Sequence, residues 1–382
     1  MEDIDNRDEL ISLVADSLNK DTSTGDRVAY FLEGPENDDI PTTVTDWIST
    51  GSSVLDVAIS NRKYGGVPIG RVTEVSGLES SGKSLLVAHI LANTQKKGGI
   101  AIYMEGEVSA YSSFLKAIGV DLNKMIYIHV TSIEQMFSLM DQLVSKIREK
   151  GKDRLVTIAV DSIAGIPTKS ELEGTFDREG YATDKAILMS KGMRKITGMI
   201  GEQKIALIFT NQLRSKLGIS WGDNFVTPGG HALAFHSSVR IRLKQMAKIK
   251  KTEAGKDKII GIQSRAYVVK NRIGPPYRHA DFNIFFDSGI DDYGGWLTVL
   301  KDYNLIDKDG KTSYILRLSE GVEIDGEKEF KFNAKKWLKV IEENEKLREY
   351  VYNMICEKMI MRYRSLHTGI DEIKISENED DE

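Results

Sequence analysis

The chain has 382 residues, of which 41% are hydrophobic and 29% charged, which is typical of a globular protein with a main domain and smaller attachments. No apolar run approaches the roughly 20 residues that cross a bilayer, and the acidic start from Met1 to Asp8 argues against a signal peptide. A single cysteine, Cys356, excludes an internal disulfide and fits a reducing compartment. The few histidines show no metal-ligand spacing.

The net charge of -5 is concentrated at one end of the chain. The last 12 residues hold seven acids and one lysine, so the rest of the chain is close to neutral. Acidic tails of this kind are usually disordered. A basic run lies elsewhere, and its common explanation is a solvated face. It consists of Arg240, Arg242, Lys244, Lys248, Lys250 and Lys251.

Residues 1–42 are predicted to form a small N-terminal appendage, in which Ile11, Val14 and Leu18 mark a short amphipathic helix before a linker. Residues 43–290 alternate short apolar runs with longer helix-period segments. This alternation predicts an α/β core with a mostly parallel central sheet. The clearest strand candidates are Val72–Val75, Ile100–Met104, Val156–Val160, Ala206–Thr210 and Ala266–Val269.

The remaining sequence predicts a small α+β C-terminal domain over residues 291–365 and an acidic disordered tail over 366–382. The C-terminal domain has a hairpin signal at Asp325-Gly326. One helix is expected from Ala334 and another near Val351.

The strongest motif is a glycine-rich loop of the form G-x-x-x-x-G-K-S between a predicted strand and an apolar helix. In such a P-loop the backbone N–H groups surround phosphates, the lysine reaches the β- and γ-phosphates, and the serine hydroxyl holds Mg²⁺. The motif therefore predicts binding and hydrolysis of ATP. Its residues are Gly77, Leu78, Glu79, Ser80, Ser81, Gly82, Lys83 and Ser84.

Polar residues end three further predicted strands. Asp161 follows a buried apolar strand, where a carboxylate orients Mg²⁺ through water in P-loop enzymes. Glu105 and Glu107 follow another strand, and spacing alone does not decide which of them orients the attacking water. Gln212 ends a fourth strand, where an amide either contacts the γ-phosphate or closes an ordinary polar turn.

The order of several segments resembles the bacterial RecA recombinase and its phage relatives of the UvsX type. The resemblance covers roughly residues 45 to 300. It rests on Ile48–Asp56, Gly65–Arg71, the P-loop, Val160–Ala164, Glu171–Gly174, Met189–Lys195, Thr210–Arg214 and Val268–Arg272. It implies that Glu107 activates water, that Gln212 senses the γ-phosphate, and that Phe114 stacks on adenine where RecA has tyrosine.

The resemblance also implies that the N-terminal appendage, residues 1–42, packs on a neighbouring subunit. It further implies two DNA-binding loops. The first matches Gly174 to about Ala182 and departs most from the family. The second matches Leu213–Gly230, a stretch rich in glycine, aromatic and basic residues that suits base stacking and backbone attraction. A DNA-contacting arginine of the family, expected near the start of a following helix, falls on Arg194. The other DNA-binding candidates are Arg178, Arg214, Lys216, Trp221 and Phe225.

Lys270 and Arg272 are expected just after the strand Ala266–Val269, two residues apart and therefore on the same side of an extended segment. Without the resemblance, the sequence favours two solvated surface cations at these positions. By resemblance they match a lysine pair that reaches the γ-phosphate of the neighbouring subunit. An arginine grips phosphate oxygens in a fork, so Arg272 is predicted to act as an arginine finger.

The sequence thus predicts a DNA-dependent ATPase that uses ATP and Mg²⁺, forms a helical homo-oligomeric filament on single-stranded DNA and exchanges strands with a homologous duplex. Two alternatives are a ring helicase on the same fold and an ATP-gated DNA-binding mediator that exchanges no strands. The resemblance suggests single-strand-binding and loading proteins as further partners and no membrane. It implies the cytoplasm of a bacterial cell, with a phage-encoded origin left open.

Overall fold

The structure is a computed structural model that describes residues 9–20, 22, 27–31, 40, 42–107, 112–151, 154–174, 180–215, 225–226, 228, 230–253 and 255–363. Its contacts divide the chain into two compact units, Met1–Thr45 and Asp46–Glu382. The first unit contains α1 (Glu9–Lys20), which confirms the amphipathic helix. The predicted boundaries at residues 42 and 290 stay predictions, and the tail 366–382 lies outside the described residues.

The described part of the second unit is built on a nine-stranded sheet in the order β13-β12-β11-β10-β3-β7-β6-β4-β5. Pairing is parallel from β10 through β3, β7, β6 and β4 to β5, and antiparallel from β10 to β13. A mostly parallel α/β core is therefore confirmed. The strands are β3 (Arg71–Gly77), β4 (Ile100–Glu105), β5 (Met125–His129), β6 (Val156–Asp161), β7 (Ile205–Gln212), β10 (Val239–Glu253), β11 (Lys256–Asn271), β12 (His279–Phe285) and β13 (Gly289–Asp291).

Helices cover both faces of the parallel strands, because alternate strand residues are apolar on each face. One face packs against α2 (Ser53–Ser60) and α3 (Lys83–Lys96), and the other against α5 (Ile133–Lys150) and α7 (Tyr181–Glu202). None of the helices in the described ranges is long and apolar enough to cross a membrane. The shorter elements are β1 (Trp47–Ile48), β2 (Val67–Pro68), α4 (Ser112–Ala117), η2 (Leu122–Lys124), η3 (Ile163–Gly165), α6 (Lys169–Glu173), β8 (Arg214–Ser215), β9 (Phe225–Val226) and α8 (Ala232–His236).

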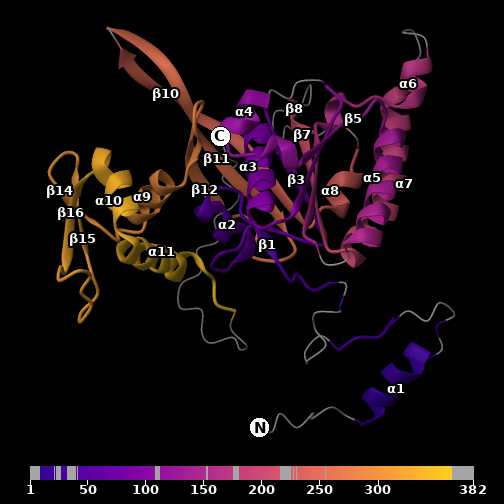
Figure 1. Cartoon of the computed structure of the whole chain (residues 1–382), viewed down its shortest axis with the longest axis horizontal. Coiled ribbons are helices and arrows are strands. Elements are labelled where there is room, and N and C mark those ends of the chain that lie inside the picture. The colour runs from indigo at the N-terminus through magenta and orange to yellow at the C-terminus, as the bar shows by residue number, and fades with distance from the viewer. Residues whose placement is uncertain are drawn as a thin grey trace. The chain divides into compact units, whose positions relative to one another are not determined.

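The hairpin of β10 and β11 is much longer than the sequence predicted, and its far part projects beyond the rest of the sheet (Figure 1). The predicted strand Ala266–Val269 is only the buried part of β11, so Lys270 lies within the strand and not after it. The rest was missed because the projecting part is mostly exposed, with lysines between its few apolar residues. Of the basic run, Arg240 pairs with the buried Glu74, and the residues from Lys248 onward lie in this projecting part.

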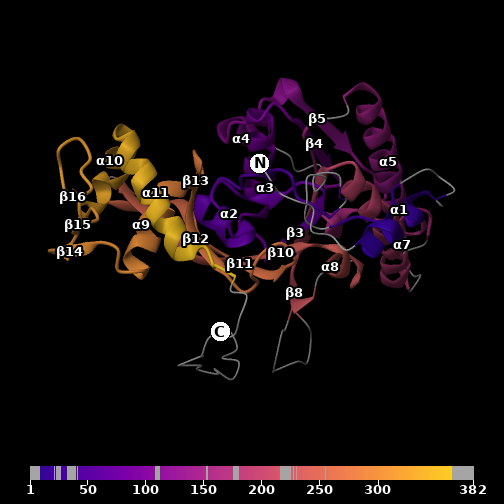
Figure 2. The ribbon, with the colours of Figure 1, turned by 90° about the horizontal axis from the view of Figure 1, so that it is seen from below.

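The C-terminal elements lie at the β12–β13 end of the sheet, away from α5 and α7 (Figure 2). The predicted turn at Asp325-Gly326 is confirmed, since both residues have positive φ, 54° and 85°. The elements are α9 (Asp292–Asp302), β14 (Asp307–Asp309), β15 (Ser313–Arg317), β16 (Glu329–Asn333), η4 (Ala334–Lys336), α10 (Trp337–Glu343) and α11 (Glu345–Met359).

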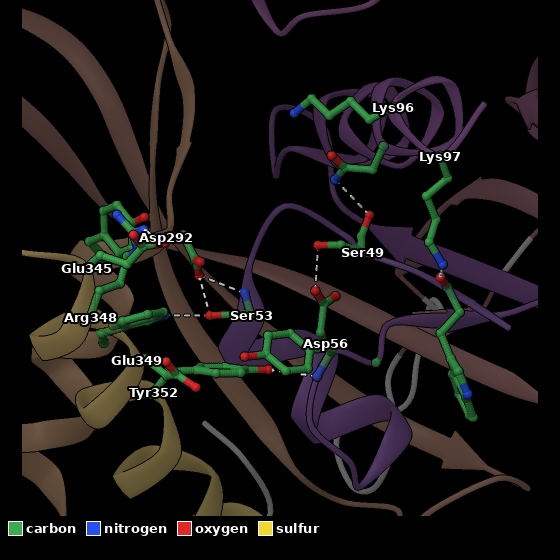
Figure 3. A pocket seen from close by; sticks show the side chains of 16 residues that line it. Ser49, Ser53, Asp56, Lys96, Lys97, Asp292, Glu345, Arg348, Glu349 and Tyr352 are labelled. Carbon is green, nitrogen blue, oxygen red and sulfur yellow. Dashed lines mark hydrogen bonds and ion pairs between the residues drawn. The ribbon is translucent and has the colours of Figure 1, made fainter. Parts of the chain in front are cut away.

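A cavity of about 640 Å³ lies where α9 and α11 meet α2 and the end of α3 (Figure 3). Asp292, the first residue of α9, accepts hydrogen bonds from the backbone N–H of Ser53 at 2.7 Å and from its hydroxyl at 2.9 Å. The indole N–H of Trp296 donates to the same hydroxyl. These bonds join the start of α2 to the start of α9.

Asp56 lies beside this junction and is 4% exposed. It accepts hydrogen bonds from the backbone N–H and the hydroxyl of Thr50 at 2.8 and 2.7 Å, and from the hydroxyl of Ser49. Burial outweighs these bonds and raises the pKa of Asp56 to about 7, and burial also raises the pKa of Asp292 to about 6. The two carboxyl groups therefore take up protons more readily in the folded than in the unfolded chain.

We expect this pair to make stability fall as pH rises. A carboxyl whose pKa is raised by folding stabilises the folded state below its ordinary pKa, and this contribution is lost as pH rises through the folded pKa. The difference in melting temperature between wild type and Asp56→Asn should therefore shift in favour of the variant between pH 5 and 7.5. The exposed Asp302→Asn serves as control, and a difference that is constant across this range would contradict the assignment.

Candidate active site

The loop between β3 and α3 has the geometry of a P-loop. Gly82 precedes α3 with a φ of 98°, which favours glycine. A Cβ at Gly77 would lie 2.4 Å from the hydroxyl of Ser81 and 2.8 Å from the carbonyl oxygen of Leu243, so no larger residue fits. The Ser81 hydroxyl donates to the carbonyl of Leu78 at 2.8 Å, and the Ser264 hydroxyl on β11 donates to the carbonyl of Ser81 at 3.1 Å.

Lys83 begins α3 and folds back over this loop. Its ammonium group donates to the carbonyl oxygens of Gly77 and Leu78 at 3.1 and 2.8 Å. Burial lowers its pKa, while the carboxylates of Asp161, Glu79 and Glu107 act in the opposite direction. The lysine ammonium, a cation that would attract phosphate oxygens, thus lies in a partly buried place near three carboxylates.

The parallel register brings the predicted strand ends to one edge of the sheet. Gly77 on β3 lies beside Gln212 on β7, and Glu105 on β4 lies beside Asp161 on β6. Asp161 is 8% exposed and accepts hydrogen bonds from the Tyr103 hydroxyl at 2.9 Å and from the Thr210 hydroxyl. Neutral donors hold this carboxylate in place, and oxygen lone pairs remain for a further ligand.

The two candidate glutamates differ sharply in environment. Glu105 is completely buried and accepts a hydrogen bond from the Tyr127 hydroxyl at 2.9 Å. Glu107 is exposed at the rim and accepts one from the Ser162 hydroxyl, next to Asp161, at 2.7 Å. Of these two glutamates, only Glu107 is both near Lys83 and open to water, which favours it over Glu105 as the group that orients the attacking water.

Ser84 and Phe114, two other candidates for nucleotide contact, lie on the first turn of α3 and on α4. Ser84 is exposed, and Phe114 is half-buried against the core. Gln212 is half-buried at the end of β7.

Only some of the DNA-binding candidates fall within the described residues. Arg178, Lys216 and Trp221 lie outside the described residues. The backbone of Arg214 in β8 pairs with Val226, next to Phe225 in β9, so a short hairpin carries the second predicted loop. The expectation that Arg194 lies near a helix start is wrong. It is exposed in the second half of α7, because the helix already begins at Tyr181.

Lys270 and Arg272 lie together, as their spacing predicted, but beside α8. The Lys270 ammonium donates to the carbonyl oxygens of Ala234 and Phe235 at 2.7 and 2.8 Å, and the Arg272 guanidinium lies 5.9 Å from the centre of the Phe235 ring. Burial, with the charges of Arg272 and Arg240, lowers the pKa of Lys270 to about 8.

The sequence reasoning missed a buried polar cluster behind this site. Glu74, in the middle of β3, is fully buried and pairs with Arg240 on β10 and Asn211 on β7. The signal for it in the sequence is a glutamate inside an apolar strand, because such a charge requires a partner.

The strand–loop–helix unit, the lysine over its carbonyls and the acidic strand ends define a P-loop ATPase. A profile of the RecA N-terminal domain family matches residues 35–291. Protein RecA of Clostridium novyi is 38% identical over 320 residues, 83% of this chain and 84% of the relative. Protein RecA of Clostridium acetobutylicum is 38% identical over 315 residues, 82% and 83% of the two chains. Protein RecA of Rickettsia bellii is 35% identical over 313 residues, 81% and 84%.

The chain belongs to the RecA family. It is therefore an ATP-dependent DNA recombinase and a DNA-dependent ATPase, which is the activity of that family. The comparisons do not favour a ring helicase or a non-exchanging mediator.

We expect Glu107→Gln to bind ATP normally but to hydrolyse it about 10²-fold more slowly, because an amide accepts a proton far less readily than a carboxylate. Glu105→Gln is the matched control, since it makes the same change two residues away, where the side chain faces Tyr127. Binding is followed with a fluorescent ATP analogue, and turnover by phosphate release. A slow Glu105→Gln beside a normal Glu107→Gln would reverse the assignment.

Proposed function

We propose that the protein polymerises on single-stranded DNA, hydrolyses ATP at the loop Gly77–Ser84, and uses the ATP-bound filament to exchange that strand with a homologous duplex. In this proposal Lys83 holds the β- and γ-phosphates, Glu107 orients water toward the γ-phosphate, and Gln212 detects that phosphate. Phe114 would stack on the adenine. The proximity of Lys83, Asp161 and Glu107 supports these roles.

The residues present fit a magnesium ion as cofactor. Mg²⁺ takes oxygen ligands and usually keeps several waters beside one or two protein groups and substrate phosphates. Ser84 and Asp161 offer such oxygens, and the described residues contain no cluster of three or more histidine, cysteine or acidic side chains that would make a closed metal site. A bound Mg²⁺ neutralises charge on the phosphates.

The observation that carries the filament proposal is the position of Lys270 and Arg272. Asn271, which lies between the two cations in sequence, pairs with Val239 on β10, and Val239 in turn pairs with Thr73 on β3. The P-loop begins four residues further along β3, at Gly77. Four residues of an extended strand span roughly 13 Å. The two cations are therefore near the opposite edge of the sheet from their own P-loop and suit the nucleotide of a neighbouring subunit.

DNA contact by residues 213–230, and by Arg178 and Arg194, is likewise proposed. Aromatic and basic side chains bind single strands by stacking and backbone attraction without reading sequence, so base pairing would select the partner strand. Single-strand-binding and loading proteins are proposed as further partners.

The single, buried Cys356 supports a reducing compartment such as the bacterial cytoplasm. The relatives named above are bacterial, and no observation supports a phage origin.

We expect Arg272→Ala to bind ATP and DNA but to hydrolyse ATP about 10³-fold more slowly, the usual effect of losing an arginine finger. Mixing it with Glu107→Gln should restore part of the turnover. At a mixed boundary, the intact site of the Arg272→Ala subunit receives Arg272 from its Glu107→Gln neighbour.

A mixture of Glu107→Gln with Lys83→Ala is the control, because both changes damage a subunit's own site and no boundary is complete. It should stay inactive. If the first mixture also stays inactive at every ratio, while labelled subunits are seen to co-assemble on DNA, Arg272 acts outside a shared site.

A further inference from the structure

The carboxylate of Asp161 is held by two hydroxyl groups that are themselves buried. The Tyr103 hydroxyl donates to one of its oxygens at 2.9 Å, and the Thr210 hydroxyl donates to the other. Tyr103 is 3% exposed and Thr210 is 0% exposed. Water therefore has little access to either hydrogen bond and cannot readily replace either donor.

The two hydroxyl groups reach Asp161 from the strands on both sides of β6. On β4, Tyr103 pairs with Ala159, two residues before Asp161, so the three side chains lie on one face of the sheet. On β7, Thr210 lies level with Asp161, because the preceding residues of the two strands pair in parallel register. The carboxylate therefore cannot turn about its Cβ–Cγ bond without breaking a hydrogen bond.

The charge of Asp161 differs in its surroundings from that of Glu74, the buried carboxylate of β3. Glu74 forms an ion pair with Arg240, whereas no ion pair joins Asp161 to a cation within the ranges that the structure describes. The charge of Lys83 acts on Asp161, but the lysine ammonium donates to two carbonyl oxygens of the loop. Buried charges are normally paired or bound to a metal ion. A buried carboxylate with neutral donors only is therefore suited to a cationic ligand.

We infer that Tyr103 and Thr210 are positioning residues for Mg²⁺, because they fix the Asp161 carboxylate in the orientation that accepts hydrogen bonds from the water shell of an ion held by Ser84. This inference rests on the proposed nucleotide and Mg²⁺ site. Mg²⁺ keeps several waters and requires near-ideal octahedral geometry, so a carboxylate that receives those waters must be well oriented. Groups that orient such a carboxylate tune the affinity for the ion although they do not touch it.

The ring of Tyr103 has a structural role that is separate from its hydroxyl. It packs in the core beside Tyr127 of β5, with 6.3 Å between the ring centres. The Tyr127 hydroxyl donates to Glu105 and not to Asp161. Removing only the oxygen atom of one ring therefore separates the hydrogen bond to Asp161 from the packing of the rings.

The test compares Tyr103→Phe and Thr210→Val with wild type in the binding of a fluorescent ADP analogue, first in EDTA and then in rising Mg²⁺. We expect the Mg²⁺ concentration at half-maximal effect to rise about tenfold in each variant, the usual consequence of losing a group that orients a metal ligand. Affinity for the analogue in EDTA should be unchanged, because no contact with the phosphates is removed. A general distortion of the loop would instead weaken binding in EDTA as well.

Mn²⁺ supplies a second readout that is independent of turnover, because its EPR spectrum reports the free ion directly. Both variants should bind Mn²⁺ in the presence of ADP more weakly than wild type. At saturating Mg²⁺, kcat should recover most of its wild-type value, since Lys83 and Glu107 are untouched. Thr210→Ser keeps the hydroxyl and should retain the wild-type Mg²⁺ requirement.

Two matched controls make the same chemical changes elsewhere in the sheet. Tyr127→Phe removes the hydroxyl that faces Glu105, and Thr157→Val removes a buried hydroxyl of β6 that is bonded to Thr94 at 2.6 Å. Neither should alter the Mg²⁺ requirement. Adding Tyr103→Phe to Asp161→Asn should weaken Mg²⁺ binding no further than Asp161→Asn alone, since the hydroxyl acts through the carboxylate.

Each outcome decides the inference. A Mg²⁺ requirement within about twofold of wild type in folded Tyr103→Phe and Thr210→Val would overturn it. So would an equal rise in the two control variants, or a further loss when Tyr103→Phe is added to Asp161→Asn. If Asp161→Asn itself keeps the wild-type Mg²⁺ requirement, the proposed Mg²⁺ site fails. If Asp161→Asn weakens Mg²⁺ binding while Tyr103→Phe and Thr210→Val do not, only the positioning role of the two hydroxyl groups fails.

Discussion

Parallel pairing of β3, β7, β6 and β4 is the constraint on which the nucleotide site depends. Strands buried on both faces are mostly apolar along their length, and apart from the paired Glu74 their carboxylates lie at the edge where the strands end. The register then fixes which ends meet, with Gly77 beside Gln212 and Glu105 beside Asp161. A shift by one residue in any of these strands would turn its terminal side chain to the opposite face. The site is therefore a property of the pairing more than of any single loop.

The same sheet accounts for the proposed action of Lys270 and Arg272 on the nucleotide of a neighbouring subunit. The carboxyl edge holds the P-loop, Asp161 and Glu107, whereas Arg272 follows β11, which runs in the opposite direction and ends near the amino edge. Because β11 pairs antiparallel with the parallel part of the sheet, the two cations and the P-loop lie at opposite edges of the same subunit. Stacked subunits would bring the two edges together. Lys270, held here by the carbonyl oxygens of α8, would have to exchange those acceptors for phosphate oxygens.

The sequence predicted the strand ends well, because apolar runs followed by Gly77, Asp161, Glu105 or Gln212 carry both the period and the stop signal. It failed on β10 and β11, where Lys248 and its neighbours fill exposed strand positions that carry no hydrophobic alternation. It could not choose between Glu105 and Glu107, since only the fold shows that the first is buried against Tyr127. Nor could it find the partners of Glu74, which come from positions 137 and 166 residues away.

Stability alone is a poor explanation for that buried carboxylate. Taking a charge out of water costs several kcal/mol, and attraction to a partner often only offsets this cost, so a well-packed apolar residue would hold the strands at least as well. What an apolar contact lacks is direction. Glu74 satisfies its donors only when β3, β7 and β10 keep one relative position, and a small displacement of Asn211 or Arg240 exposes an uncompensated charge in a medium of low polarity. A group of this kind turns small shifts between strands into large differences in free energy, so it fixes the relative position of the three strands.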